Sequence, residues 1–125
     1  MRLSDSFFYV VRREKDGDKQ LFTVRLNGKH EIFEAHFPGE PVTPGVCQLQ
    51  MVTECAEQLL GKRIYVKEVK NIKYLLLMRP VEGCEYLIEL SGVEAEGNEC
   101  RIKAVIRCGL DVCTKMSIVL SENRI

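Results

Sequence analysis

The chain has 125 residues, of which 46% are hydrophobic and 29% are charged. This composition is typical of a globular protein and excludes a disordered or fibrous one. Its 18 basic residues balance its 18 acidic residues, so net charge gives no reason to expect nucleic acid or a membrane surface as a partner. The length suits one hydrophobic core and is too short for two, which predicts a single domain over residues 1–125.

The chain shows neither a targeting segment nor a metal site. The N-terminal region lacks the long apolar stretch of a signal peptide, and the apolar run at 75–78 is far shorter than the roughly 20 residues of a membrane span. The six cysteines form no Cys-x-x-Cys pair, and both histidines precede them. We therefore expect a cytoplasmic protein with reduced thiols, no metal and no cofactor.

The first half of the chain predicts two strands, a loop and a helix. An apolar run covers residues 7–11, and apolar residues alternate with polar ones over 22–26, as in half-buried strands. Residues 32–44 contain three prolines, which predicts a loop. From Val46 the apolar residues recur every three or four positions, which predicts an amphipathic helix that ends at Gly61.

The second half predicts strands only. Residues 64–78 form one bent strand or two strands, and three further strands are expected over 86–90, 102–106 and 112–120. Several strands and one helix predict an α+β domain. A single helix leaves part of the sheet uncovered, so we expect a second subunit to bury it, in a homodimer or a larger even-numbered assembly.

One segment resembles a family signature. The residues His36-Phe37-Pro38-Gly39, then Pro41-Val42-Thr43-Pro44-Gly45, stand directly before the helix. Together they resemble the motif of the β-hydroxyacyl-acyl-carrier-protein dehydratases. A weaker match, Arg79-Pro80-Val81, lies downstream, and the resemblance covers about residues 30–94.

The resemblance implies a hotdog fold, an antiparallel sheet wrapped around one central helix, usually in a dimer with shared active sites. It implies that His36 is the catalytic histidine and that the Gly45 amide holds the thioester oxygen. The neighbouring residues Phe37, Pro38, Pro44 and Val46 would contact the substrate, a thioester of acyl carrier protein or of coenzyme A. Histidine suits proton transfer near pH 7, and a helix N-terminus suits developing negative charge.

The chain departs from this pattern at the helix acid. The family places Glu or Asp fourteen residues after the histidine, where this chain has Gln50. An amide does not donate and regain a proton as a carboxylic acid does. One helical turn later, where the family commonly has glutamine, the chain has Glu54, so the two side chains look exchanged. Both are candidate catalytic positions, and each also fits a structural role.

Three functions remain open from the sequence. The first is a β-hydroxyacyl thioester dehydratase of fatty-acid or related acyl synthesis, and the intact His36 loop favours it. The second is a hotdog thioesterase in which a carboxylate such as Glu54 activates water. The third is a non-catalytic acyl-binding or partner subunit, which Gln50 favours.

Charge is unevenly distributed along the second half. Residues 62–79 contain six basic residues and one acidic residue, whereas residues 80–100 contain six glutamates and no basic residue. Pairing of opposite charges across neighbouring strands is the simpler explanation. The alternative is a basic surface for an acidic carrier protein or for the phosphate of its pantetheine arm.

Overall fold

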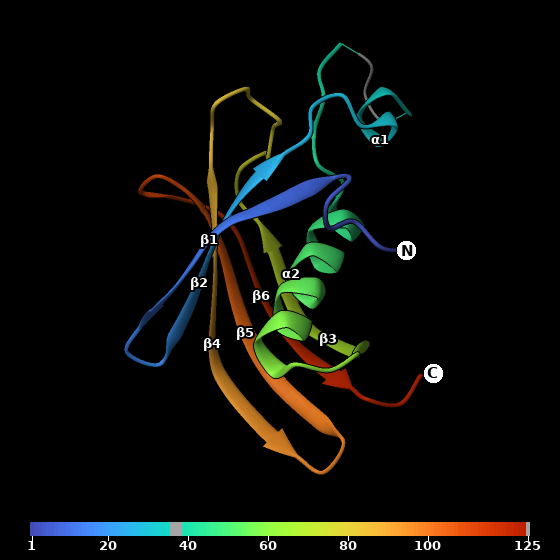
Figure 1. Ribbon diagram of the computed structural model, residues 1–125, viewed down its shortest axis with the longest axis vertical. Coiled ribbons are helices and arrows are strands. Elements are labelled where there is room, and N and C mark those ends of the chain that lie inside the picture. The colour runs from blue at the N-terminus through green and yellow to red at the C-terminus, as the bar shows by residue number, and fades with distance from the viewer. Residues whose placement is uncertain (36–38, 125) are drawn as a thin grey trace.

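One long helix lies against a six-stranded antiparallel sheet in the computed structural model (Figure 1), which describes residues 1–35 and 39–124. The elements in chain order are β1 (Phe8–Asp16), β2 (Lys19–Leu26), α1 (Glu31–Ala35), α2 (Gly45–Leu60), β3 (Tyr65–Tyr74), β4 (Tyr86–Glu96), β5 (Glu99–Cys108) and β6 (Asp111–Ser121). The predicted α+β class is confirmed. None of the described helices is long and apolar enough to cross a bilayer.

The strand order in the sheet is β1-β2-β4-β5-β6-β3. The last three strands in sequence, β4 to β6, form a meander whose tight turns place Gly97 and Gly109 at positive φ, where glycine has no steric penalty. Strand β3 crosses over to pair with β6, so β1 and β3 form the two edges. Bulges in β3 after Val66 and Val69 bend it, as the length of the 64–78 segment suggested.

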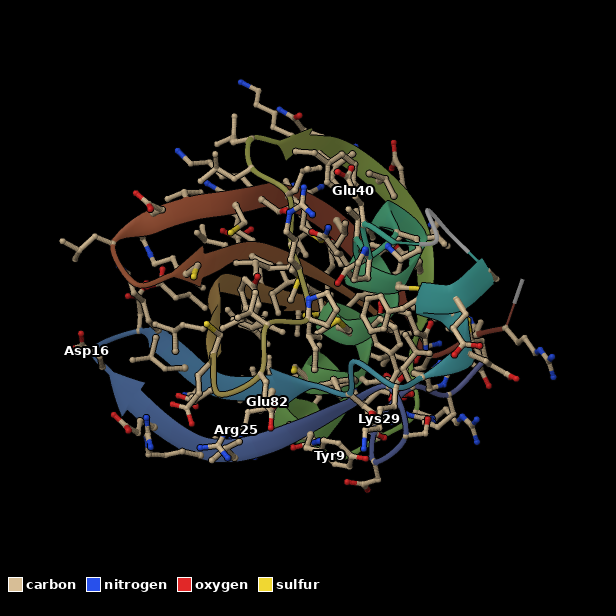
Figure 2. The ribbon with its side chains drawn as sticks, turned by 90° about the horizontal axis from the view of Figure 1, so that it is seen from above. Tyr9, Asp16, Arg25, Lys29, Glu40 and Glu82 are labelled. Atoms are coloured by element: carbon tan, nitrogen blue, oxygen red, sulfur yellow. The ribbon has the colours of Figure 1, made fainter. Side chains whose placement is uncertain are left out.

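The core lies between the sheet and α2. The sheet curves around the helix when viewed from above (Figure 2). Alternate strand side chains face α2 and are fully buried there; they include Phe22, Val24, Ile88, Leu90, Ile102, Ile106 and Leu120. The helix contributes Met51, Val52, Cys55 and Ala56, all fully buried. Each buried side chain the size of Met51 or Val52 stabilises the fold by about 1.5–3 kcal/mol, so this face fixes the helix against the sheet.

The loop predicted over residues 32–44 is wrong at its beginning, where the structure has α1. The prolines that argued for a loop start only at residue 38, so residues 31–35 are free to form one helical turn. The turn is held by Phe33, which stacks on Phe7 with 4.8 Å between ring centroids. His30 begins it, because its Nδ1 accepts a hydrogen bond of 3.1 Å from the Ile32 N–H.

Charge pairing across neighbouring strands explains part of the uneven charge: Glu89 of β4 pairs with Arg107 of β5, and Glu85 beside β4 pairs with Arg25 of β2. It does not pair the basic run with the acidic run. The basic run lies on and around β3, whose neighbour is β6, while the acidic run lies on and around β4. Among the ion pairs of residues 1–35 and 39–124, Lys67–Glu99 alone joins the two runs. The crossover of β3 to the far edge, which the strand pattern does not reveal, separates them.

Candidate active site

The loop that leads into α2 is anchored from two sides. The Gln48 side chain is buried; its Oε1 accepts a hydrogen bond from Thr114 Oγ1 on β6 at 2.5 Å, and its Nε2 donates to the Thr43 carbonyl at 3.2 Å. The Thr43 N–H donates to the Met78 carbonyl at 2.7 Å. A buried amide with both ends satisfied is rigid. The residues before the helix are therefore fixed relative to β6 and to the segment after β3.

Helix α2 begins at Gly45, and its first N–H groups have no hydrogen-bond partner within the helix. Pro44 takes the position before the helix, and its carbonyl accepts from the N–H groups of Cys47 and Gln48. Within the described residues, no acceptor pairs with the N–H of Gly45 or of Val46. The Val46 side chain is 65% exposed. Unpaired N–H groups at a helix N-terminus stabilise a nearby negative charge; the role of the Gly45 amide stays a prediction.

The Tyr74 ring lies against the start of α2 at Gly45, where a larger residue would require the ring to move. It lies so close to the Gly45 Cα that an added Cβ would stand 2.7 Å from the Tyr74 Cζ. Burial against the helix raises the pKa of the Tyr74 phenol, so the ring presents a neutral hydroxyl beside the first turn of α2. The end of β3 and the beginning of α2 thus form one contact, and no sequence motif pointed to this tyrosine.

The predicted catalytic histidine, His36, and its neighbours Phe37 and Pro38 lie outside the described residues. Their roles in proton transfer and in substrate contact stay predictions. Figure 2 views the molecule from above and labels Glu40, in the loop before α2, and Glu82, in the segment between β3 and β4.

The second matching patch has a structural role in the described fold. The Tyr86 hydroxyl donates to the Arg79 carbonyl at 2.8 Å and lies 2.9 Å from the Arg79 N–H, which donates to it. This pair of hydrogen bonds fixes the irregular segment between β3 and β4. The Thr43 N–H donates to the carbonyl of Met78, so the first patch is joined to the residue directly before the second patch, close to the beginning of α2.

Gln50 and Glu54 lie together on α2, as the exchanged pair predicted. Gln50 Nε2 donates to Glu54 Oε2 at 2.9 Å and to the Met1 carbonyl at 2.7 Å. The carboxylate of Glu54 also accepts from the backbone N–H of Leu3 at 2.7 Å and of Ser4 at 2.8 Å. The two side chains thus hold the N-terminal segment, residues 1–4, against the helix, and we call this set of contacts the N-terminal clasp.

The clasp keeps Glu54 ionised. Burial raises the pKa of this carboxyl, whose residue is only 1% exposed. Hydrogen bonds from Leu3, Gln50 and Ser4 favour the anion and outweigh burial, so the pKa lies below its ordinary value. A carboxylate that is ionised, buried and fully hydrogen-bonded is poorly suited to donate a proton near pH 7.

A thiol nucleophile at the helix start is disfavoured. Cys47 stands in the first turn of α2 but is buried, and burial raises the pKa of its thiol. A raised pKa leaves the thiol protonated at neutral pH, whereas the thiolate is the nucleophile. The six cysteines are free in the structure.

Comparisons with curated proteins point to acyl dehydratases. A 3-hydroxyacyl-acyl-carrier-protein dehydratase FabZ of Levilactobacillus brevis is 27% identical over 100 residues, which cover 74% of this chain and 66% of that protein. A FabZ of Pectobacterium atrosepticum is 24% identical over 127 residues, covering 94% of this chain and 84% of that one. Against the FabZ proteins of Levilactobacillus brevis, Pediococcus pentosaceus and Lactiplantibacillus plantarum, the matched region spans about half to two thirds of their length.

Solved structures share the fold. The dehydratase heterocomplex ApeI:P of Xenorhabdus doucetiae has a chain that superposes with a TM-score of 0.74 at 19% identity, covering 90% of this chain and 96% of that one. A hypothetical thioesterase of Streptococcus pneumoniae, solved with coenzyme A, gives a TM-score of 0.64 at 10% identity over 94% of this chain and 90% of that one. These likenesses confirm the predicted hotdog fold.

The family follows from the sequence. A family model described as ApeI dehydratase matches residues 12–106, most of the chain. The match includes the His36 loop, the helix that follows it and the clasp residues of that helix, together with β2, β3, β4 and parts of β1 and β5. This chain belongs to the ApeI-like dehydratase family.

Proposed function

We propose that the protein removes water from a β-hydroxyacyl thioester, carried by acyl carrier protein or by coenzyme A, in fatty-acid or related acyl synthesis. The observation that carries the proposal is the rigid start of α2, where the amides of Gly45 and Val46 are unpaired within the described chain, directly after the His36 motif. The thioester carbonyl would accept a hydrogen bond from the Gly45 amide, with Pro44 and Val46 beside it, as negative charge develops.

In this mechanism His36 does the proton transfer. Its neutral imidazole takes the α-proton of the substrate, and the electron pair left behind forms the double bond as the β-hydroxyl leaves. The hydroxyl needs a proton to leave as water. The family's helix acid would supply it, and Gln50 has no acidic proton to give, so in this chain the imidazolium formed at His36 is the remaining donor. This mechanism predicts a slow reaction.

Gln50 supports a second candidate, a partner subunit. In this alternative the chain binds acyl thioesters and pairs with a different hotdog subunit that supplies the missing acid. The similar structure from Xenorhabdus doucetiae is described as a dehydratase heterocomplex, which supports pairing with a different subunit for this chain. The N-terminal clasp favours it further, because the carboxylate of Glu54 is occupied by Leu3 and Ser4.

A thioesterase that uses Glu54 is less well supported than either. General-base activation of water requires a carboxylate that reaches the water, and Glu54 is 1% exposed with both oxygens hydrogen-bonded to the N-terminal segment and Gln50.

Product analysis with a β-hydroxyacyl thioester separates the three functions. Formation of the enoyl thioester supports the dehydratase, and release of a free thiol supports the thioesterase. Binding without either product supports the partner subunit. Loss of enoyl formation in a His36→Ala variant would assign the chemistry to the predicted histidine, whereas an unchanged rate would contradict the mechanism.

Assembly is part of the proposal. Edge strand β3 and the segment after it expose large apolar side chains: Val69 is 40% exposed, Tyr74 51%, and Leu75, Leu76 and Leu77 50–60%. An exposed edge strand beside an apolar patch favours pairing with another subunit. We therefore propose a homodimer, or a larger even-numbered assembly, formed along β3.

Light scattering at micromolar concentration should give the mass of a dimer or a larger even-numbered assembly. Leu76→Glu should shift the protein toward the monomer, because it places a charge in the apolar patch. Leu110→Glu is the matched control: Leu110 is 98% exposed in the turn between β5 and β6, so this change should leave the mass unaltered. A monomeric wild-type protein would rule out a site shared between identical subunits.

The free thiols also bear on location. The six cysteines are unpaired in the structure, which fits the reducing conditions of the cytoplasm. A cytoplasmic location accordingly remains part of the proposal.

A further inference from the structure

A cavity of about 500 Å³ lies beside Gln50, between the second half of α2 and the start of β3. Its size is within the range of small-molecule sites. Three arginines line it: Arg2 from the N-terminal clasp, Arg63 from the turn after α2, and Arg124 from the chain end. The cavity therefore collects basic residues from three segments that are far apart in sequence.

Two of these arginines have no charged partner among the described residues. The Arg2 guanidinium pairs with Glu57 and lies 3.6 Å from Glu54, so its charge is neutralised. Within residues 1–35 and 39–124, neither Arg63 nor Arg124 forms a hydrogen bond or an ion pair with another side chain.

Some neighbouring basic residues are paired, whereas Lys73 and Arg79, which do not line this cavity, form no ion pair in the described part of the chain. Lys62 pairs with Glu122, Lys67 with Glu99 and Lys70 with Glu68. General surface pairing thus accounts for these three lysines and leaves the two arginines of the cavity available. Guanidinium groups present planar pairs of N–H donors that match the oxygens of phosphate. An anion with phosphate geometry is the ligand that this charge arrangement fits.

The size and the lining of the cavity suit a ligand larger than a free phosphate ion. Its volume exceeds what a single phosphate fills, and the half-buried Tyr65 and Val66 add aromatic and apolar surface to a wall that is otherwise largely polar. Such a wall suits an organic chain that carries the phosphate. Gln50 borders the same cavity, so a ligand bound there extends to the position where the family keeps its acid.

We propose that Arg63 and Arg124 bind the phosphate of a phosphopantetheine arm in this cavity. The identity of the arm rests on the proposed function, while the anion site rests on the cavity and its charges. Coenzyme A and a holo carrier protein both carry this phosphate. Arg2 would shape the cavity from its paired position with Glu57 and need not contact the ligand.

Isothermal titration calorimetry with 4′-phosphopantetheine and with pantetheine, which lacks the phosphate, tests the site. The phosphate should strengthen binding by roughly 100-fold, and Arg63→Gln and Arg124→Gln should each remove about 10-fold, as expected for lost hydrogen bonds to a charged group. Arg101→Gln is the matched control, because Arg101 is also exposed and borders a different hollow. It should leave the affinity unchanged.

Equal affinity for the two probes, or unaltered phosphopantetheine binding in the Arg63→Gln/Arg124→Gln double variant, would overturn the site. Two further titrations distinguish the sources of the arm: one with coenzyme A, and one that compares holo carrier protein with apo carrier protein, which lacks the arm. Binding of coenzyme A, or tighter binding of the holo than of the apo carrier protein, supports the site if the double variant weakens it. The measurement needs no turnover. Phosphate-dependent binding by a protein that forms no enoyl product would therefore contradict the dehydratase while leaving the anion site intact.

Discussion

Replacing Gln50 with glutamate should raise the rate of enoyl-thioester hydration by about 10²- to 10⁴-fold, the usual contribution of a general acid or base. The new carboxyl would stand where Gln50 Nε2 now lies 2.9 Å from the ionised carboxylate of Glu54. A neighbouring anion raises the pKa of a carboxyl, so the introduced side chain would hold a proton that it can donate. A carboxyl whose pKa is raised toward neutrality can donate a proton to the leaving hydroxyl in dehydration and, by microscopic reversibility, take a proton from water in hydration, the direction measured.

The same change should cost stability above the ordinary carboxyl pKa. A group whose pKa is raised by folding is stabilising while protonated, and this contribution is lost as pH rises. The variant also loses the Gln50 donor to the Met1 carbonyl. Thermal unfolding at pH 5 and pH 8 should therefore show a larger deficit at pH 8.

Gln58→Glu is the control for this prediction. It makes the same substitution on the exposed face of the same helix, so it should change neither rate nor stability appreciably. A folded Gln50→Glu variant whose hydration rate equals that of the wild type would show that the helix acid is irrelevant to this protein.

Glu54→Gln should destabilise the protein by about 3 kcal/mol, in the range for losing hydrogen bonds to a buried charged group. The carboxylate accepts from Leu3 N, Ser4 N and Gln50 Nε2. An amide at position 54 offers one acceptor oxygen and places an NH₂ group against donors. Urea unfolding at pH 7 measures the loss, and proteolysis should cut the released residues 1–4 sooner than in the wild type.

The loss should depend on pH with a definite sign. Folding lowers the pKa of Glu54 below its ordinary value of 4.5, so its contribution is complete above pH 4.5 and disappears as pH falls below that value. The difference between wild type and variant should shrink accordingly in acid. Glu68→Gln is the matched control, since Glu68 is exposed on β3 and its pair with Lys70 lies at the surface.

Activity separates the two roles that the sequence leaves open for Glu54. If Glu54 has a structural role only, the Glu54→Gln variant should show the wild-type turnover per folded molecule when it is assayed at a temperature at which it is folded. A drop of about 10²-fold or more under those conditions would mean that Glu54 acts as the acid and that the N-terminal clasp opens during the reaction.

Local sequence patterns were enough to establish the class of the fold and the position of its central helix. Apolar residues alternate over 22–26 and 86–90 and recur every three or four positions after Val46. Such spacing shows which face of a strand or helix is buried, and it can be recognised in the sequence alone. Gly61 was predictable as the helix end for the same reason: its φ of 69° is one that glycine adopts freely. The His36 motif was readable because its residues are contiguous.

The contacts of Gln50 and Glu54 could not be predicted from the sequence and became known only from the tertiary structure. Their partners, Met1, Leu3 and Ser4, stand about fifty positions earlier, and no spacing rule connects such segments. The contact of Tyr74 with Gly45 and the grouping of the cavity arginines depend in the same way on where β3 and the chain ends pack. Sequence patterns record which face of an element is buried, whereas the identity of what covers that face is set by the packing of distant segments.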